Sequence, residues 1–306
     1  MSEEILIFGH KNPDTDSICS SIVMADLENK LGKHCIATRI GKINKETQFV
    51  LDYLKLEAPK MIDKAEDGQE VILVDHNEAT QSIDNIENAK ILKVIDHHTM
   101  NFKAPYQLYY RTEPVGCTAT VLYKIYKENN IEMTKEIAIL CLSSIISDTL
   151  LFKSPTCTED DIKVANALQK IANIDMQEYG LEMLKAGTDL GEFSEEELVN
   201  LDAKAFDKGD TKFVIAQVNT VSIEDVLKRQ QELESAINSE IDKKGLQLFV
   251  FAITDILNSN SKLIVLGKKA SVTEKAFEKK LENNTMFLEG VVSRKKQILP
   301  NIDKNI

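Results

Sequence analysis

Short apolar runs and amphipathic stretches alternate along the first part of the chain. The apolar runs have the length and composition of buried strands, which are predicted at residues 4–8, 35–39, 71–74, 91–95 and 106–110. Helical spacing predicts helices at residues 17–31, 45–56, 116–129, 135–147, 159–173 and 175–186. Strands that alternate with helices indicate a mostly parallel sheet covered on both faces. The fold class predicted for this part is therefore α/β.

The alternating pattern stops near residue 187, where Gly187 and Gly191 interrupt a largely polar segment. Beyond it, strands are predicted at residues 204–207, 212–219, 247–255, 262–267 and 286–292, and helices at residues 222–243 and 272–282. We therefore predict three parts, with a smaller C-terminal α/β domain as the last. They are an N-terminal domain of residues 1–186, a linker of residues 187–193 and a C-terminal domain of residues 194–306.

Composition and charge narrow the class of protein. With 43% apolar and 28% charged residues the chain is globular, and no apolar run reaches the roughly 18 residues that a membrane span needs. The net charge of −12 argues against a nucleic-acid partner. Five cysteines, an odd number without CxxC spacing, indicate free thiols. The first residues lead directly into a predicted strand, so no signal peptide is expected and the predicted localisation is cytoplasmic.

Side chains of the type that bind metals follow four of the apolar segments. Loops at the carboxyl ends of strands in an open α/β sheet meet in one crevice, so these side chains are expected to lie together. Carboxylate oxygens and imidazole nitrogens in one cluster indicate a metal site, for more than one ion. The candidates are His10, Asp14, Asp16, Asp75, Asp96, His97, His98 and Asp148.

Residues 10–17 form the first of these segments. Ser17 is a suitable N-cap for a helix that begins at Ile18, which would leave Asp14 and Asp16 in an extended loop. Both carboxylates would then point to one side and could reach neighbouring ions. The alternative for any single acidic residue here is an ordinary turn or capping role.

The histidines and the last acidic candidate add to this picture. Four of the five histidines, at positions 10, 76, 97 and 98, lie in these strand-end motifs. Two adjacent histidines cannot face the same way, so one of His97 and His98 would bind metal and the other would face substrate. Asp148 follows a helix that is apolar on nearly every side, where a charge is costly unless it is paired with a metal or a donor. The alternative is solvent exposure at the helix end.

Cations follow an apolar segment of the second domain. Arg294, Lys295 and Lys296 come directly after the strand-like residues 290–292, and their side chains suit phosphate oxygens. The alternative is a solvated edge, but the short apolar strand before them predicts that at least one turns inward. The chain has no GxxxxGK[ST], GxGxxG, GxSxG or HExxH motif. Binding of a nucleoside triphosphate, binding of a dinucleotide and serine-hydrolase activity therefore lose their usual support.

Five motifs in order, GHKNPDTDS, VDHNE, DHH, SDT and SRKKQ, resemble those of a known family. They are similar to the manganese-dependent inorganic pyrophosphatases, the family II enzymes of the DHH phosphoesterase superfamily. The resemblance covers essentially the whole chain, and the set of five motifs is specific. It implies hydrolysis of inorganic pyrophosphate to two orthophosphates by a hydroxide that two metal ions activate. It also implies that the active site lies in the cleft between the two domains.

The resemblance implies a role for each candidate residue. Asp75 and Asp148 would bridge the two ions, and Asp96 would support the cluster. The first ion would be held by His10, Asp14, Asp75 and Asp148. The second would be held by Asp16, Asp75, His97 and Asp148. The residues that would reach the substrate are His98, Lys204, Arg294, Lys295 and, less directly, Lys296.

The implied cofactors are two Mn²⁺ per subunit, which Co²⁺ can replace, and Mg²⁺ that arrives with the substrate. The implied partner is pyrophosphate, with no nucleic acid and no membrane. Bacterial members of the family are commonly homodimers through the N-terminal domain, so a homodimer is a further expectation.

Two other functions compete with this interpretation. The nearer one is a short-chain exopolyphosphatase or another DHH phosphoesterase. Nuclease-type relatives generally carry a glycine-rich motif, and this chain has no Gly-Gly pair. Polyphosphatase-type relatives often have Arg where this chain has His98. A different class is a non-catalytic metal or phosphate sensor, which has no need of two bridging carboxylates.

Overall fold

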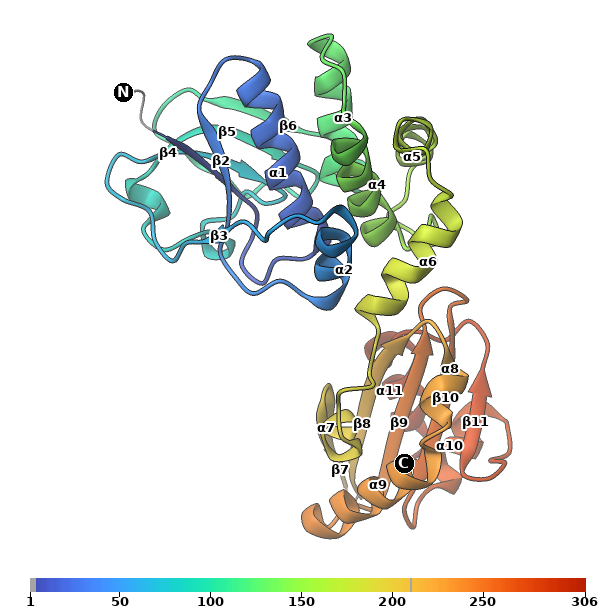
Figure 1. Ribbon diagram of the computed structural model, residues 1–306. Coiled ribbons are helices and arrows are strands. Elements are labelled where there is room, and N and C mark those ends of the chain that lie inside the picture. Colours follow the sequence, from blue (N-terminus) through green and yellow to red (C-terminus); the bar gives the residue numbers. More distant parts are fainter. Residues whose placement is uncertain (1–3, 210) are drawn as a thin grey trace. The chain divides into compact units, whose positions relative to one another are not determined.

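The computed structural model describes residues 4–209 and 211–306. Contacts within the chain divide it into two compact units, with the division between Gly187 and Thr188. Both units are α/β, which confirms the predicted fold class (Figure 1). The predicted cleft concerns the relation of the two units to each other and stays a prediction. In the part of the chain that the structure describes, no helix has the length and apolar character needed to cross a membrane.

The first unit contains a six-stranded sheet in the order β3-β2-β1-β4-β5-β6, and every pair of neighbouring strands is parallel. Its strands are β1 (Ile5–Phe8), β2 (Cys35–Arg39), β3 (Lys60–Met61), β4 (Glu70–Val74), β5 (Lys90–Asp96) and β6 (Tyr109–Thr112). The sequence pattern missed β3, a two-residue exposed strand, and predicted β6 three residues too early. The order places β4 between β1 and β5, so the ends of these three strands are neighbours.

Helices α1 and α3 contact the sheet, and α4 packs against both of them as a further layer. Every residue of α4 from Ile137 to Ile146 is buried, which fits its largely apolar sequence. The helices of this unit are α1 (Thr15–Lys30), α2 (Lys45–Leu54), α3 (Thr118–Glu128), α4 (Lys135–Thr149), α5 (Glu159–Ala172) and α6 (Met176–Gly187). Two short turns of 3₁₀ helix, η1 (Ala79–Gln81) and η2 (Ile86–Asn88), lie between β4 and β5.

One hydrophobic cluster of this unit contains no residue from the α-helices. Phe8, Leu73 and Val94 of the sheet pack with Ile83 and Ile86 from the segment that joins β4 to β5. This connecting segment therefore covers part of the sheet. It also lies directly beside the ends of β4 and β5, where the candidate metal ligands are.

The second unit contains a five-stranded mixed sheet in the order β11-β10-β9-β8-β7, in which only β8 and β9 are parallel. Its strands are β7 (Ala203–Lys208), β8 (Thr211–Thr220), β9 (Leu248–Asp255), β10 (Asn260–Leu266) and β11 (Thr285–Leu288). Its helices are α7 (Glu195–Asn200), α8 (Ile223–Leu227), α9 (Gln230–Lys244), α10 (Ser271–Phe277), the π-helix η3 (Arg294–Ile298) and α11 (Leu299–Asn305). Alternate residues of β9 belong to two different core clusters, so both faces of this sheet are covered.

Three predicted elements of the second unit differ from the structure. The helix predicted at residues 222–243 is two helices, because the chain breaks between α8 and α9 at Lys228 and Arg229. The helix predicted at residues 272–282 ends at Phe277. The strand predicted at residues 286–292 ends at Leu288, before the left-handed Gly290. Residues 290–292 therefore form an irregular segment, and the strand expected to turn a cation inward is absent there.

Candidate metal centre

The candidate ligands of the first unit come from the carboxyl ends of β1, β4 and β5 and from the starts or ends of helices. Parallel strands end at one edge of the sheet, which is why residues so far apart in sequence lie together. The side chains that meet are those of His10, Asp14, Asp16, Asp75, His97, His98 and Asp148.

Asp75 lies at the centre of this cluster. Its Oδ2 atom is 3.3 Å from Nε2 of His10, and its Oδ1 atom is 3.3 Å from Nε2 of His97. Each carboxylate oxygen therefore faces a different imidazole. Asp75 is buried and has a φ of +57°, a left-handed conformation that is uncommon for a residue other than glycine and often occurs at functional sites.

Asp14 is shared between a helix and the cluster. One of its oxygens accepts a hydrogen bond from the backbone N–H of Ser17 at 3.0 Å, and the other lies 3.4 Å from Nε2 of His10. Asp14 is thus the N-cap of α1, which begins at Thr15, and the prediction that Ser17 is the N-cap is wrong. The predicted extended loop is wrong as well, since Asp16 lies inside the first helical turn.

Asp16 consequently belongs to a different group from Asp14. Its carboxylate is fully buried and accepts hydrogen bonds from Oγ of Ser20 at 2.6 Å and from the backbone N–H of Thr118 at 2.8 Å. Ligand atoms of Asp16, Cys117 and Asp148 lie within 4.8 Å of one another. Asp148 is in the last turn of α4 with a side chain only 16% exposed, which argues against a solvated helix end.

The two adjacent histidines lie side by side, with ring centroids 4.2 Å apart, and both approach Oδ1 of Asp75. The prediction that they cannot face the same way is therefore wrong, because the chain turns after Asp96, but their other contacts differ. His97 is close to two carboxylates, with Nε2 3.3 Å from Asp75 and 3.9 Å from Asp148, and its Nδ1 lies 3.1 Å from the carbonyl oxygen of Val115. A hydrogen bond from Nδ1 to that carbonyl would leave Nε2 free to bind a metal. The His98 side chain is about half exposed (53%), and its Nδ1 lies 2.9 Å from Oδ1 of Asp96.

Asp96 is buried beneath these histidines. It accepts hydrogen bonds from the backbone N–H groups of His97 and His98 and from the side-chain amide of Asn77 at 2.6 Å. These donors satisfy the carboxylate and fix the turn that carries both histidines.

The acidic side chains repel one another in this buried cluster. Burial and the neighbouring Asp16 and Asp75 carboxylates raise the pKa of Asp148 well above its ordinary value. Burial and Asp75 likewise raise the pKa of Asp16 to about 6. For His10, burial disfavours the imidazolium, but Asp14 and Asp75 outweigh it and raise the pKa to about 11. Bound cations would relieve this excess of negative charge.

The donor set itself fits divalent metal ions. The Oδ2 atom of Asp75 is buried without a hydrogen-bond partner, although His10 is within ion-pair distance. Such an oxygen is costly to bury unless a cation binds it. Mixed imidazole and carboxylate donors suit Mn²⁺ or Co²⁺ better than they suit an ion that prefers oxygen alone.

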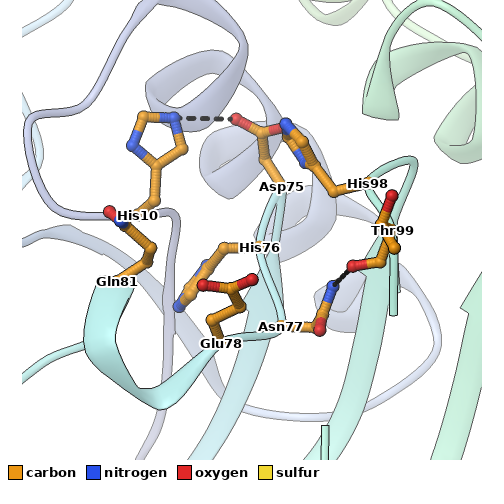
Figure 2. A pocket seen from close by; sticks show the side chains of 8 residues that line it. All are labelled: His10, Asp75, His76, Asn77, Glu78, Gln81, His98 and Thr99. Carbon is orange, nitrogen blue, oxygen red and sulfur yellow. Dashed lines mark hydrogen bonds and ion pairs between the residues drawn. The ribbon is translucent and has the colours of Figure 1, made fainter. Parts of the chain in front are cut away.

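A pocket of about 300 Å³ opens beside the cluster (Figure 2). The His10 and Asp75 side chains that line it point toward each other, and His98 lies next to Asp75. The residues that line it are His10, Asp75, His76, Asn77, Glu78, Gln81, His98 and Thr99. His76 is buried with Nδ1 near the carbonyl oxygen of Val74 and Nε2 near Ser82, and burial lowers its pKa to about 4. Its two ring nitrogens are therefore occupied within the fold.

The sequence pattern did not single out Cys117, Thr118 or Asn77, which also lie at this cluster. Cys117 and Thr118 follow β6 and begin α3, so the rule for strand ends could have pointed to them. Neither the thiol nor the hydroxyl belongs to a motif with a familiar ligand spacing.

The candidate cations lie in the second unit. The Arg294 guanidinium donates hydrogen bonds to the backbone carbonyl of Asp202 at 2.5 Å and to its carboxylate at 2.9 Å. Asp202 immediately precedes β7, which carries the exposed Lys204. Arg294 is thus held beside the start of the strand of Lys204, while Lys295 and Lys296 are exposed.

Gln297 fixes the segment that carries these cations. Its Oε1 atom accepts hydrogen bonds from the backbone N–H groups of Val292 and Ser293, and its amide donates to the carbonyl oxygen of Gly290. The segment forms a turn of π-helix, a rare conformation that is frequent at functional sites.

Known proteins resemble both parts of the chain. Residues 4–145 match the DHH family, N-terminal domain, and residues 181–305 match the DHHA2 domain. A probable manganese-dependent inorganic pyrophosphatase of Bacillus velezensis is 59% identical over 97% of each chain. The manganese-dependent inorganic pyrophosphatase of Bacillus subtilis is 57% identical over 97% of each chain. The crystal structure of a putative family II inorganic pyrophosphatase from Methanococcus jannaschii has a TM-score of 0.64 and 41% identity, and it covers 98% of this chain and 99% of that one.

A parallel-sheet unit with clustered carboxylates and histidines, followed by a DHHA2 unit, defines a two-domain protein of the DHH class. The sequence identities of 59% and 57% over nearly the whole length narrow this class to one family. The chain belongs to the family of manganese-dependent inorganic pyrophosphatases, which confirms the resemblance of its five motifs.

Proposed function

We propose that the protein hydrolyses inorganic pyrophosphate to two orthophosphates with two Mn²⁺ ions bound in the first unit. The observation that carries the proposal is the position of Asp75, whose two oxygens each lie 3.3 Å from a different histidine. A carboxylate placed in this way is suited to bridge two ions. Two relatives with 59% and 57% identity are named a probable manganese-dependent inorganic pyrophosphatase and a manganese-dependent inorganic pyrophosphatase, which supports both the substrate and the metal.

The proposed ligands divide into two sets that share Asp75 and Asp148. The first set is His10, Asp14, Asp75 and Asp148, and the second is Asp16, Asp75, His97 and Asp148. Support for the first is the close group of His10, Asp14 and Asp75. Support for the second comes from His97, which lies near both Asp75 and Asp148, and from Asp16, which is grouped with Asp148.

When bound, two such ions supply Lewis-acid polarisation of phosphate oxygens and lower the pKa of a shared water toward neutrality. The chain contributes the rest of the chemistry by position and charge. His98 lines the pocket, and the Asp96 carboxylate raises the pKa of its imidazole. The imidazolium form is thereby favoured, and it can donate a hydrogen bond to a phosphate oxygen.

The cations of the second unit are the proposed phosphate-binding groups. Arg294 offers a planar pair of N–H donors, while Lys204 and Lys295 offer point charges. Lys296 would act less directly. Phosphoryl transfer depends mainly on positioning and on stabilising charge on the oxygens, so these side chains would bind pyrophosphate and stabilise the departing phosphate.

The proposal includes three finer points. Co²⁺ would replace Mn²⁺, because the imidazole and carboxylate donors suit both. Mg²⁺ would arrive with the substrate. The protein would form a homodimer through the first unit, whose sheet has two edge strands, β3 and β6.

The test is phosphate release by metal-stripped protein to which Mn²⁺ or Mg²⁺ alone is returned. Pyrophosphate, tripolyphosphate and a dinucleotide are compared as substrates. Rapid turnover of pyrophosphate alone, restored by Mn²⁺, is the expected result. Cleavage of tripolyphosphate or the dinucleotide with little turnover of pyrophosphate would instead indicate another DHH phosphoesterase.

A further inference from the structure

Thr118, the first residue of α3, contacts two carboxylates of the metal centre at once. Its backbone N–H donates a hydrogen bond to Oδ2 of Asp16 at 2.8 Å, and its hydroxyl donates one to Oδ1 of Asp75 at 3.2 Å. The Thr118 side chain is fully buried, as is that of Asp16, and Asp75 is nearly so. Water therefore does not compete for these hydrogen bonds, and each has a larger effect than an exposed one.

The hydroxyl acts on one particular side of Asp75. The oxygen that it contacts, Oδ1, is the one that faces His97, whereas Oδ2 faces His10. Asp16, which the backbone N–H contacts, is also a proposed ligand of the ion beside His97. Both contacts of Thr118 therefore concern the ion that would be held by Asp16, Asp75 and His97.

A third carboxylate, which is not a proposed metal ligand, also holds the start of α3. Asp161, fully buried at the start of α5, accepts hydrogen bonds from the backbone N–H of Gly116 at 2.9 Å and from the Thr120 hydroxyl at 2.6 Å. A Cβ atom on Gly116 would lie 2.9 Å from this carboxylate, so only glycine fits there without a shift. Thr118 is thus presented to the metal centre by a segment that has little freedom to move.

We propose that Thr118 is a positioning residue that orients Asp75 and Asp16 for the ion on the His97 side. The inference rests on the proposed ligand set. A carboxylate oriented by a hydrogen bond loses less conformational freedom when it binds a metal, and such outer contacts commonly change metal affinity by about 10- to 100-fold. The hydroxyl is the part that a substitution can remove, because the backbone N–H remains in every variant.

Three variants separate positioning from general stability. Thr118→Val keeps the shape of the side chain and removes the hydroxyl, while Thr118→Ser keeps the hydroxyl and removes the methyl group. Thr38→Val is the matched control, since it removes a buried threonine hydroxyl of the same unit that contacts the carbonyl oxygen of Ile7 and neither a proposed ligand nor the start of α3. Each metal-free protein is titrated with Mn²⁺ in a calorimeter, and the melting temperature of each metal-free protein is measured in parallel.

For Thr118→Val we expect one of the two Mn²⁺ sites to weaken by about 10- to 100-fold while the other changes little. Thr118→Ser should bind both ions within a few-fold of the parent protein. Thr38→Val should keep its Mn²⁺ affinities even if its melting temperature falls. If Thr118→Val does not fold, the comparison of Thr118→Ser with Thr118→Ala takes its place.

Two results would overturn the inference. The first is wild-type affinity at both sites in Thr118→Val, and the second is an equal loss of affinity in Thr38→Val. If the parent protein itself binds fewer than two Mn²⁺ ions, the proposed ligand set is wrong. If the parent binds two ions and the Thr118 variants bind them equally well, the inference about Thr118 is wrong but the proposed function is unaffected.

Discussion

Nε2 of His10 and Oδ2 of Asp75 lie 3.3 Å apart, although that carboxylate oxygen has no hydrogen-bond partner. The other oxygen of Asp75 has the same separation from His97. The parallel order of β1, β4 and β5 produces this arrangement, because it brings the residues after the three strands to one edge of the sheet. Asp75 is thus the residue on which both proposed metal sites depend.

Replacement of Asp75 by Asn should therefore remove the metal pair. An amide oxygen carries no full charge and its NH₂ group repels a cation, so neither site would keep its shared anion. We expect fewer than two Mn²⁺ per chain by elemental analysis, and a loss of pyrophosphate turnover of more than about 100-fold. Asp52→Asn, an exposed position on α2, is the control and should behave as the parent. A fully active Asp75→Asn protein with two ions would refute the bridging role.

Arg294→Ala should separate substrate binding from metal binding. The guanidinium contacts Asp202 in the second unit and no proposed metal ligand, so Mn²⁺ content should be unchanged. Loss of charge-assisted hydrogen bonds to phosphate should reduce kcat/KM by about 10- to 100-fold. Arg111→Ala, which removes an ion pair with Glu113 and Glu128 on the first unit, is the matched control. Loss of metal from Arg294→Ala would mean that the roles of the two units are assigned wrongly.

Metal removal should lower the stability of the whole protein. Without cations, the carboxylates of Asp16, Asp75 and Asp148 repel one another in a buried cluster, and a metal that binds only the folded chain stabilises it by mass action. Each site adds about 2.7 kcal/mol at 100 times its dissociation constant. Thermal unfolding followed by circular dichroism, with excess chelator or with Mn²⁺, should show a clear rise in Tm with metal. Equal Tm values in both conditions would contradict the assignment of this cluster as a metal centre.

A prediction about the pH dependence of stability concerns Glu46, which is not a proposed metal ligand. Its Oε1 atom accepts hydrogen bonds from the hydroxyl groups of Thr15 and Ser147 at 2.6 and 2.5 Å, and burial raises the pKa of Glu46. The folded state therefore binds the proton more tightly than the unfolded chain. This contribution to stability is present below the ordinary pKa of about 4.3 and is lost as pH rises through the raised value.

Glu46→Gln resembles the protonated acid at every pH. Relative to the parent, its Tm should rise as the pH increases from about 4.5, measured by thermal unfolding of metal-free protein. The exposed Glu57→Gln is the control and should show no such trend. A difference in Tm that falls or stays constant over this range would contradict the burial argument.

Much of the fold follows from the sequence pattern, but helix starts do not. Asp14, Thr15, Asp16 and Ser17 are all good N-caps, so composition alone does not select among them, and the structure uses Asp14. Because α1 begins at Thr15, Asp16 lies within the helix and is grouped with Cys117 and Asp148 instead of with His10 and Asp14. The break between α8 and α9 contains no proline or glycine from which it could be predicted. Arg229 donates hydrogen bonds there to the carbonyl oxygens of Leu190 and Phe193, a contact of tertiary structure.

In the candidate site, too, some residues could be predicted from the sequence and others could not. The candidate residues His10, Asp75, Asp96, His97 and His98 could be chosen from the sequence because they end or follow apolar strands. Thr118 could not be predicted from the sequence, because its proposed role depends on the contact of its hydroxyl with Asp75, 43 positions away. Contacts of that kind exist only after the sheet has brought the two segments together.

The most direct test of the central claim is the electron paramagnetic resonance spectrum of metal-free protein titrated with Mn²⁺. Two ions bridged by Asp75 should bind per chain and give an exchange-coupled spectrum that is lost in Asp75→Asn. A single bound ion, or two ions with independent six-line spectra, would contradict a shared carboxylate at this centre.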